Sequence, residues 1–454
     1  MIRMMSLLLT FFVFFMTAAM TLADDDTTSP SSGSQLKTLV SDLGSTQEDD
    51  AEVQSESEPK PELEPERPSE AISDNTLEEK SKEMLEEIQQ PSYTVLRLSW
   101  KIVPYAVKYK VTVEGEELIT YINSIEVPVN ATDKIFKVIA LDYDDNVISS
   151  DIDIIEVETN PTVVKTTTEF DKMDYAPLYP VYSWVPKHNA DYYQVQLLKD
   201  GEVVRDYTTK FKDEDDVYDF YDPMPVNESG DYYWRVKAMS KYGFAVSEWS
   251  KETDSTSFKV KAPVKFAAFG DSITHGGGAI TVPPSIILYN WETYCDKPIK
   301  NLGKSGDTTD QLLDRFDTDV LPFSPKILVI MAGVNDYRGT ILGWHTVSNY
   351  KILAEKCKEH HIIPVFVTPT PVNPKLINHV KFIDPPPYDW QTHYKYACDW
   401  IKRQEYFIDL TAEFEDSEGF LREDLTTDGL HPDIEGKKII GKAVKDWLSK
   451  NSLF

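Results

Sequence analysis

The stretch VKFAAFGDSIT, residues Val264–Thr274, joins a short apolar run to a glycine, an aspartate and a serine. The apolar part has the length and composition of a buried strand in a parallel sheet. Gly270 permits a tight turn after that strand, so Ser272 falls at the strand's carboxyl end. Open α/β sheets place their ligand sites at this edge. The stretch therefore predicts an α/β domain with a candidate nucleophile on its functional edge.

Residues 262–454 continue this domain with an alternation of short apolar runs and helical segments. Buried strands are predicted at residues 264–269, 327–331, 362–367 and 406–410. Helices are predicted at residues 310–316, 347–359, 391–403 and 434–448. Strands that alternate with helices in this way form a parallel sheet with helices on both faces.

A base and a carboxylate for Ser272 lie near the end of the chain, where Asp428 and His431 precede the last predicted helix. A serine hydroxyl becomes an effective nucleophile only when a base takes its proton. An imidazole can be that base, and a carboxylate on its other nitrogen fixes its tautomer. One turn can hold both groups, so the sequence predicts a catalytic triad. Taken alone, Asp428 and His431 also fit a capped helix entry.

Two segments between these positions offer hydrogen-bond donors. Gly303 lies in NLGKSG, residues 301–306, and its backbone amide can approach a substrate oxygen closely. Asn335 lies in AGVND, residues 332–336, and carries a side-chain amide after an apolar strand. Together with the amide of Ser272, these are the donors that an oxyanion needs. A turn at Gly303 and a helix cap at Asn335 are the structural alternatives.

These blocks resemble, in kind and order, those of the SGNH (GDSL-like) hydrolase family: Gly270-Asp271-Ser272, Gly303, Gly333-x-Asn335-Asp336 and Asp428-x-x-His431. The resemblance covers residues 262–454 and implies a three-layer α/β/α flavodoxin-like sandwich. It also implies Ser272 as nucleophile, His431 as base and Asp428 as the orienting carboxylate. The implied oxyanion hole is formed by the amides of Ser272 and Gly303 and the side chain of Asn335. The implied acyl-enzyme chemistry uses no metal and no organic cofactor. The Gly-x-Ser-x-Gly motif of the α/β-hydrolases is absent around Ser272, which argues against that fold.

Aromatic residues in the predicted mouth loops suggest a carbohydrate substrate, because sugar rings stack on aromatic side chains. Candidate substrate contacts are Asp271, Tyr337, Trp344 and Trp390, and Arg338 lies in the same loops. Ordinary packing of the loops is the alternative for the aromatic residues. The leading hypothesis is an esterase that deacetylates extracellular polysaccharide. The alternatives are a lipase, lysophospholipase or thioesterase of the same family, and a surface adhesion protein whose hydrolase domain only binds.

Two all-β modules are predicted before this domain, at residues 91–158 and 159–261. Trp100 and Trp184 are each followed by Ala at +6, Tyr at +9 and Val at +11, so the modules look like repeats. Their alternating strands resemble fibronectin type III or related immunoglobulin-like sandwiches. Such modules either contact glycan or a cell surface, or act as rigid spacers, which is the interpretation we favour. The α/β domain is expected to have its own core and to fold without them.

The N-terminal segment has the anatomy of a cleavable signal peptide, residues 1–23. Arg3 precedes the apolar run Leu7–Phe15, and small residues at Thr21 and Ala23 flank the predicted cleavage site. A retained anchor is the alternative, but the run is short for a membrane span. Residues 24–90 hold 20 acidic and 5 basic residues and predict a disordered acidic linker. We therefore expect a secreted or cell-surface protein with no stable membrane span.

The formal net charge of −30 excludes nucleic acid as a partner, because such a surface repels phosphates. The expected partner is an acylated small molecule or polysaccharide. The three cysteines, Cys295, Cys357 and Cys398, are too few for a disulfide scaffold, and their pairing is left open. Their spacing does not suggest a metal site.

Overall fold

The computed structural model describes residues 93–451 except 131–134, 210–218, 280–281 and 381–382. The predicted signal peptide (1–23) and acidic linker (24–90) lie outside the described residues. Within the described ranges, no helix is long and apolar enough to cross a membrane. Cys295, Cys357 and Cys398 are free thiols.

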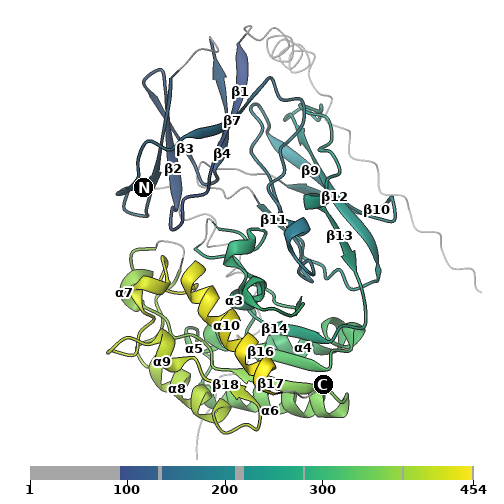
Figure 1. The fold of residues 1–454 in the computed structure, drawn as a ribbon, viewed down its shortest axis with the longest axis vertical. Helices are drawn as coiled ribbons and strands as arrows, with labels where there is room; N and C mark the ends of the chain where they lie inside the picture. Colours follow the sequence, from purple (N-terminus) through teal and green to yellow (C-terminus); the bar gives the residue numbers. More distant parts are fainter. Residues whose placement is uncertain (1–92, 131–134, 210–218, 280–281, 381–382, 452–454) are drawn as a thin grey trace, which may run out of the picture. The chain divides into compact units, whose positions relative to one another are not determined.

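The C-terminal domain is built on five parallel strands in the order β15-β14-β16-β17-β18 (Figure 1). Their bounds are β14 Phe266–Gly270, β15 Lys300–Asn301, β16 Ile327–Met331, β17 Ile363–Val367 and β18 Phe407–Ile408. Numbered from the first strand of the domain, the order is 2-1-3-4-5, the flavodoxin-like arrangement. The sequence predicted all of these strands except β15, which has only two residues and leaves no periodic signal.

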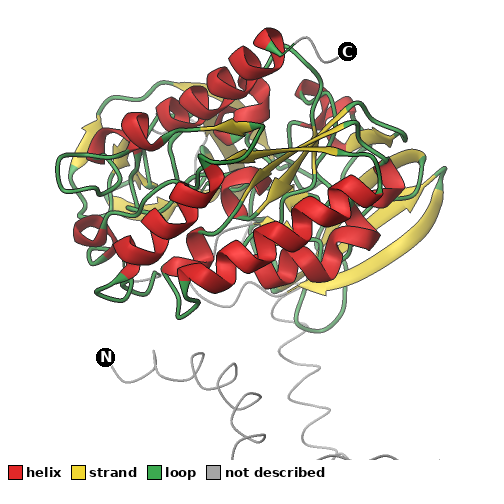
Figure 2. Ribbon diagram, turned by 90° about the horizontal axis from the view of Figure 1, so that it is seen from below, coloured by secondary structure: helices red, strands yellow, loops and turns green. Residues whose placement is uncertain are grey.

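Helices cover both faces of this sheet (Figure 2). They are α3 Ser272–His275, α4 Thr309–Asp319, α5 Val334–Tyr337, α6 Gly343–Glu359, α7 Pro374–Ile377, α8 Trp390–Ile401, α9 Thr411–Phe414 and α10 Ile434–Lys450. Leu328 of β16 packs in one buried cluster with Leu353 of α6, and Val329 packs in another with Val444 of α10. Consecutive strand residues point to opposite faces, so the domain has the predicted α/β/α layers. The predicted helices correspond to α4, α6, α8 and α10.

The first β-module has two antiparallel sheets, in the orders β4-β1-β7 and β3-β2-β5-β6. The bounds are β1 Thr94–Trp100, β2 Lys108–Val113, β3 Glu116–Thr120, β4 Ser124–Val129, β5 Phe136–Leu141, β6 Val147–Ser149 and β7 Ile154–Thr159. Alternate residues of β2 are buried, which is typical of a strand with one face on a core. This module buries its own apolar cluster around Trp100.

The second β-module has sheets in the orders β10-β9-β12-β13 and β11-β8. The bounds are β8 Val181–Ser183, β9 Tyr192–Lys199, β10 Glu202–Thr209, β11 Asp219–Tyr221, β12 Gly230–Met239 and β13 Ser257–Val260. Short 3-10 helices are η1 Phe170–Lys172 and η2 Asp254–Thr256 here, and η3 Ile287–Tyr289, η4 Trp291–Tyr294, η5 Leu321–Phe323 and η6 Glu423–Leu425 in the C-terminal domain. The β-rich character of residues 93–260 is as predicted, whereas the fibronectin type III assignment stays a prediction.

The two modules repeat one local packing arrangement around the tryptophans that the sequence singled out. Trp100 contacts Tyr109 at a ring-centroid distance of 5.3 Å, and Trp184 contacts Tyr193 at 5.2 Å. The hydroxyl of Tyr109 accepts from the backbone amide three residues after Trp100 at 2.9 Å. The hydroxyl of Tyr193 accepts from the corresponding amide of Lys187 at 2.8 Å. The spacing of Trp and Tyr at +9 therefore places a tyrosine whose hydroxyl binds the loop between the two residues and holds that loop against the core.

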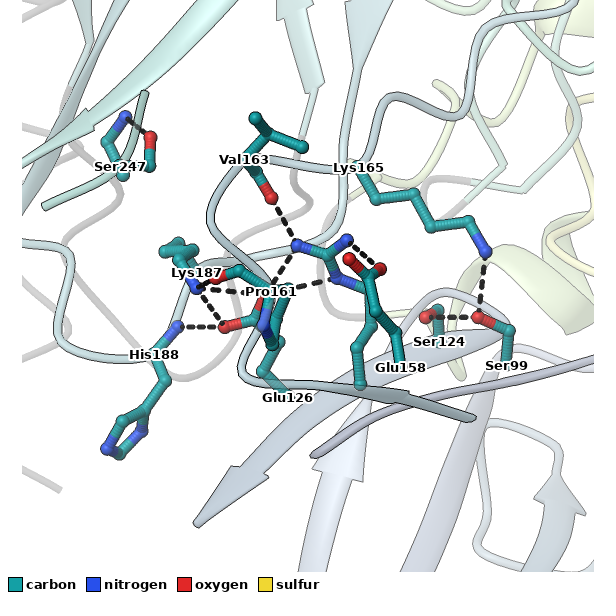
Figure 3. Close-up of polar contacts among 12 residues, drawn as sticks. Ser99, Ser124, Glu126, Glu158, Pro161, Val163, Lys165, Lys187, His188 and Ser247 are labelled. Atoms are coloured by element: carbon teal, nitrogen blue, oxygen red, sulfur yellow. Dashed lines mark hydrogen bonds and ion pairs between the residues drawn. The ribbon is translucent and has the colours of Figure 1, made fainter. Parts of the chain in front are cut away.

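A buried ion cluster joins the two modules (Figure 3). The carboxylate of Glu126, whose side chain is 1% exposed, accepts from Arg97 at 2.7 Å and from Lys187 of the second module at 3.1 Å. It also accepts from the backbone amide of His188 at 2.9 Å, and Arg97 reaches Glu158 at 2.7 Å. Buried ions need such specific partners to offset their desolvation, so the cluster holds the modules in one orientation.

The second module also shares a core with the C-terminal domain. One continuous cluster of buried apolar side chains runs from Trp184 and Trp234 of the module to Phe269 and Leu302 of the α/β domain. The α/β domain thus has the expected core of its own on one face of its sheet, around Val329 and Val444, and shares the core on the other face with the second module. Sequence patterns report which residues are buried, and they do not report which neighbour buries them.

Candidate active site

Ser272 begins α3, directly after the strand β14. Asp271 caps this short helix, because its carboxylate accepts from the amide of Ile273 at 3.0 Å. Gly270 lies so close to the neighbouring strand β16 that a Cβ there would lie 2.1 Å from the carbonyl oxygen of Met331. The sequence Gly-Asp-Ser thus turns the chain at the sheet edge. It places Ser272 Oγ 3.0 Å from His431 Nε2.

Asp428 holds the imidazole of His431 on the side opposite to Ser272. The imidazole Nδ1 lies 2.7 Å from Asp428 Oδ2, while Asp428 Oδ1 accepts from the amides of Leu430 at 2.8 Å and His431 at 2.7 Å. Burial acts to raise the pKa of Asp428, but His431 and these hydrogen bonds outweigh it and hold the pKa below its ordinary value. The carboxylate is therefore ionised near neutral pH, which favours the tautomer with a proton on Nδ1. In that tautomer Nε2 can accept the proton of Ser272.

Asn335 lies in α5 with its side-chain amide fixed by two neighbours. Its Nδ2 donates to the carbonyl of Asp307 at 2.9 Å, and its Oδ1 accepts from Arg338 Nε at 3.2 Å. A carbonyl only accepts and a guanidinium only donates, so these contacts settle which amide atom is nitrogen. An amide nitrogen carries two hydrogens, and the second remains available for a substrate oxygen.

The structure gives Gly303 a different role from the predicted one. Its amide donates to Asn301 Oδ1 at 2.9 Å, and a Cβ at this position would lie 2.3 Å from the backbone nitrogen of His275. The lack of a side chain at Gly303 thus allows its loop to pack closely beneath α3. Gly306, with φ of +87° and open space beside its Cα, lines the pocket that holds Ser272 and Asn335. The correction moves the predicted oxyanion donor from one glycine to another in the same loop. The segment NLGKSG contains both glycines, and only the geometry of the loop distinguishes their roles.

The pocket around Ser272 has a volume of about 260 Å³. Its lining residues are Tyr221, Ser272, Gly276, Gly278, Ala279, Val282, Ser305, Gly306, Asn335, Arg338, Ile383, Asp428, Leu430 and His431. The volume is below the usual range of about 300–1,000 Å³ for sites that hold drug-sized ligands. The cavity thus fits a small acyl group better than a long one.

The four predicted substrate contacts do not line this pocket. Tyr337 and Trp390 are 1% and 3% exposed and stack on each other in the core at 5.8 Å. Trp344 is 60% exposed at the start of α6 and packs edge-on against His345, and Asp271 is buried as the cap of α3. The expectation is therefore corrected for Tyr337 and Trp390, which serve core packing, whereas a substrate contact of the exposed Trp344 stays a prediction.

Arg338 and Tyr221 are among the lining residues that the sequence analysis did not single out as contacts. Arg338 comes from a predicted mouth loop, and its proximity in sequence to Asn335 was a signal for its position. Tyr221 comes from β11 of the second β-module. Nothing in its local sequence distinguishes it from the other tyrosines of that module, so no sequence signal could have found it.

Comparisons with known proteins bear on the C-terminal domain. Residues 268–439 match the model of the GDSL-like Lipase/Acylhydrolase family. A curated relative, the uncharacterized lipoprotein YqeF of Bacillus subtilis (strain 168), is 33% identical over an alignment of 129 positions, and the match covers 23% of this chain and 48% of the relative. The chain thus spans about half the length of the curated relative that it matches.

Solved structures are also similar to this chain. A GDSL-like lipase from Bacteroides thetaiotaomicron VPI-5482 has 25% identity and a TM-score of 0.33, over 41% of this chain and 88% of that one. A lipase/acylhydrolase from Enterococcus faecalis has 23% identity and a TM-score of 0.34, over 41% and 95%. An acetylxylan esterase from Geobacillus stearothermophilus has 20% identity and a TM-score of 0.32, over 41% and 94%. The family model supports a GDSL-like (SGNH) acylhydrolase domain in the C-terminal region, the class that its sequence blocks predicted.

Proposed function

We propose that this protein is a secreted serine esterase that removes acetyl or similarly small acyl groups from carbohydrate esters. The observation that carries the proposal is the hydrogen-bonded series of Ser272, His431 and Asp428 beside Gly306 and Asn335 in one pocket. A nucleophile, a base, an orienting carboxylate and oxyanion donors are the parts that acyl transfer needs.

The proposed reaction has two halves. Ser272 Oγ attacks the ester carbon as its proton passes to His431 Nε2, and the oxyanion accepts from the Ser272 amide, the Gly306 amide and Asn335 Nδ2. The tetrahedral intermediate expels the alcohol, which takes the proton from His431, and leaves an acyl-serine. Water then attacks the acyl-serine with His431 as base, and the acid departs. Asp428 stays ionised throughout and stabilises the imidazolium.

The small pocket supports an acetyl rather than a long acyl group as the substrate. Acetylated xylan, the substrate named for one of the similar structures, is a direct choice for a first polymer. A lipase or thioesterase of the same family is the alternative. It predicts that long acyl esters outperform acetate esters, whereas our proposal predicts the reverse.

The proposed location outside the cell rests on the predicted signal peptide with cleavage near Ala23. The curated relative is named a lipoprotein, which is compatible with a protein that acts at the cell surface. Polysaccharide esters would be accessible from that location.

The test is acetate release from ethyl acetate and acetylated xylan by the purified wild type and Ser272→Ala. Loss of the nucleophile should lower kcat by at least about 10⁴-fold while circular dichroism stays unchanged, because only one hydroxyl is removed. A fluorophosphonate should label wild type at Ser272 and leave the variant unlabelled. Wild-type rates in folded Ser272→Ala would refute the assignment of the nucleophile.

A further inference from the structure

One wall of the catalytic pocket comes from outside the acylhydrolase domain. Tyr221 ends β11 of the second β-module, where it pairs with Val181 of β8. The same residue lines the pocket that contains Ser272 and His431. Tyr221 as a whole residue is 43% exposed, so part of it lies where the pocket opens to solvent, whereas burial around its hydroxyl raises the pKa of that group well above its ordinary value.

A histidine between the two domains fixes this wall. The ring of Tyr221 packs edge-on against His275, with centroids 5.8 Å apart. His275 Nδ1 lies 3.3 Å from the amide nitrogen of Ser305, which can only donate, so Nδ1 carries no proton. His275 Nε2 is therefore the protonated nitrogen, and it donates to the carbonyl of Tyr179 in the second module at 2.7 Å. Through His275, the module is connected to the loop that carries Ser305 and Gly306.

Further buried polar contacts hold the module against the acylhydrolase domain. Lys300 is 3% exposed and donates to the carbonyl of Ala176 at 2.7 Å. The hydroxyl of Tyr179 donates to the buried carboxylate of Asp319 at 2.8 Å. Such groups are costly to leave unpaired in the interior, so the domains resist sliding past each other. The position of Tyr221 relative to Ser272 is thereby set by the fold.

The exposure of the lining residues indicates which part of the substrate Tyr221 meets. Ala279 and Leu430 are each 3% exposed and enclose the interior of the pocket. A small acyl group bound to Ser272 fits inside, whereas the polymer that carries it must extend toward solvent. The exposed part of Tyr221 therefore lies on the side of the alcohol. The face of an aromatic ring is a platform on which a sugar ring stacks.

We propose that Tyr221 is a specificity-determining residue that stacks on the sugar ring of the leaving alcohol, so the second β-module forms part of the substrate site. The proposal rests on the proposed esterase function and extends it by naming the group that recognises the carbohydrate. It replaces the interpretation of this module as a spacer.

The test compares two substrates in the full-length protein: an acetylated xylo-oligosaccharide, and ethyl acetate, whose alcohol has no ring. The quantity measured is the ratio of kcat/KM for the first substrate to kcat/KM for the second. Tyr221→Ala should lower this ratio about 3- to 10-fold, mostly through KM, which is the size of one aromatic contact. Tyr221→Phe keeps the ring and should keep the ratio within about twofold of wild type.

Phe244→Ala is the matched control, because Phe244 is a 54% exposed aromatic residue of the same module outside the pocket. Both of its rates should equal those of wild type. An unchanged ratio in Tyr221→Ala, or a shift in preference between acetyl and butyryl esters in place of the sugar effect, would overturn the proposal. Absence of acetate release from both substrates by wild type would instead refute the esterase function.

Discussion

The two β-modules look like repeats in sequence, yet they bury themselves against different neighbours. The first has its own apolar cluster around Trp100 and meets the second through the ion cluster of Glu126. The second continues its core into the acylhydrolase domain and contributes Tyr221 to the lining of the pocket that contains Ser272. A shared sequence pattern and a shared packing of Trp on Tyr therefore do not imply an equal role, because the role follows from what the outer faces contact.

The strongest way to test this difference is to remove either the first module alone or both modules together. A chain that begins at Ala262 lacks half of the shared core, so we expect it to be insoluble or to lose more than about 100-fold in kcat/KM on ethyl acetate. A chain that begins at Pro161 retains that core and should stay within a few-fold of wild type. Thermal melting and ethyl acetate kinetics of both chains provide the measurement. A folded, fully active chain from Ala262 would show that the shared core is dispensable.

The ion cluster allows the first module to be weakened without touching the site. Glu126→Ala leaves Arg97 and Lys187 without their buried partner, which costs roughly 3–5 kcal/mol. We expect a lower free energy of unfolding for the first module in urea, while kcat/KM on ethyl acetate stays within about twofold. Lys110→Ala, which removes an exposed ion pair with Glu117, is the control and should cost less than about 1 kcal/mol. A large loss of activity in Glu126→Ala would mean that the first module also supports the site.

Within the pocket, the acylhydrolase domain should supply the chemistry and the module the selectivity. Asn335→Ala should lower kcat roughly 10²- to 10³-fold on any acetate ester, the usual size for one oxyanion donor. Its KM should change little, since the charge that it meets exists mainly in the transition state. Steady-state kinetics on ethyl acetate distinguish this pattern from the KM effect expected for Tyr221→Ala. A rise in KM with unchanged kcat would make Asn335 a ground-state binding residue.

The contact through His275 should make the shared interface sensitive to acid. Burial lowers the pKa of His275 to about 4, with Arg315, Lys437 and Lys304 acting in the same direction, against 6.5 for a free histidine. Between these values the unfolded chain binds more protons than the folded one. The contribution of His275 to the free energy of unfolding is therefore complete above about pH 6.5. It decreases by up to about 3 kcal/mol as the pH falls toward 4.

His275→Gln removes this titration and keeps a side chain that can donate to Tyr179. The difference in urea midpoint between pH 7.5 and pH 4.5 should be smaller in the variant than in wild type. Buried carboxyls such as Asp271, whose pKa burial raises to about 7, titrate in both proteins and cancel in this comparison. Equal differences in the two proteins would mean that His275 does not titrate as the geometry predicts.

The sequence predicted those parts of the site that depend on local chain geometry. Ser272 after a buried strand and the Asp428–His431 turn could be read from neighbouring residues, and the structure brings them within hydrogen-bond distance. The choice between Gly303 and Gly306 could not, because it depends on how one loop packs under α3. Tyr337 and Trp390 were assigned to the substrate for a similar reason, since composition does not tell an aromatic residue in the core from one at a mouth.

The contribution of Tyr221 was unpredictable for a different reason. It depends on a contact between segments that are about 50 residues apart and belong to different domains, which no local pattern encodes. The repeat between Trp100 and Trp184 even pointed away from it, because a repeated module suggests a repeated function. Contacts between domains set this feature, and only a three-dimensional description contains them.

The shared core has a consequence for how such proteins are inherited. A gene exchange at the boundary near residue 261 separates Trp184 and Trp234 from Phe269, so the recombinant receives two halves of an interior that did not adapt to each other. An exchange between the first and second modules separates the ion cluster of Glu126 and the contact of Tyr105 with Tyr289, but it leaves the shared core in one piece. We therefore expect the second module and the acylhydrolase domain to be inherited together in descendants of this chain, whereas the first module can be replaced.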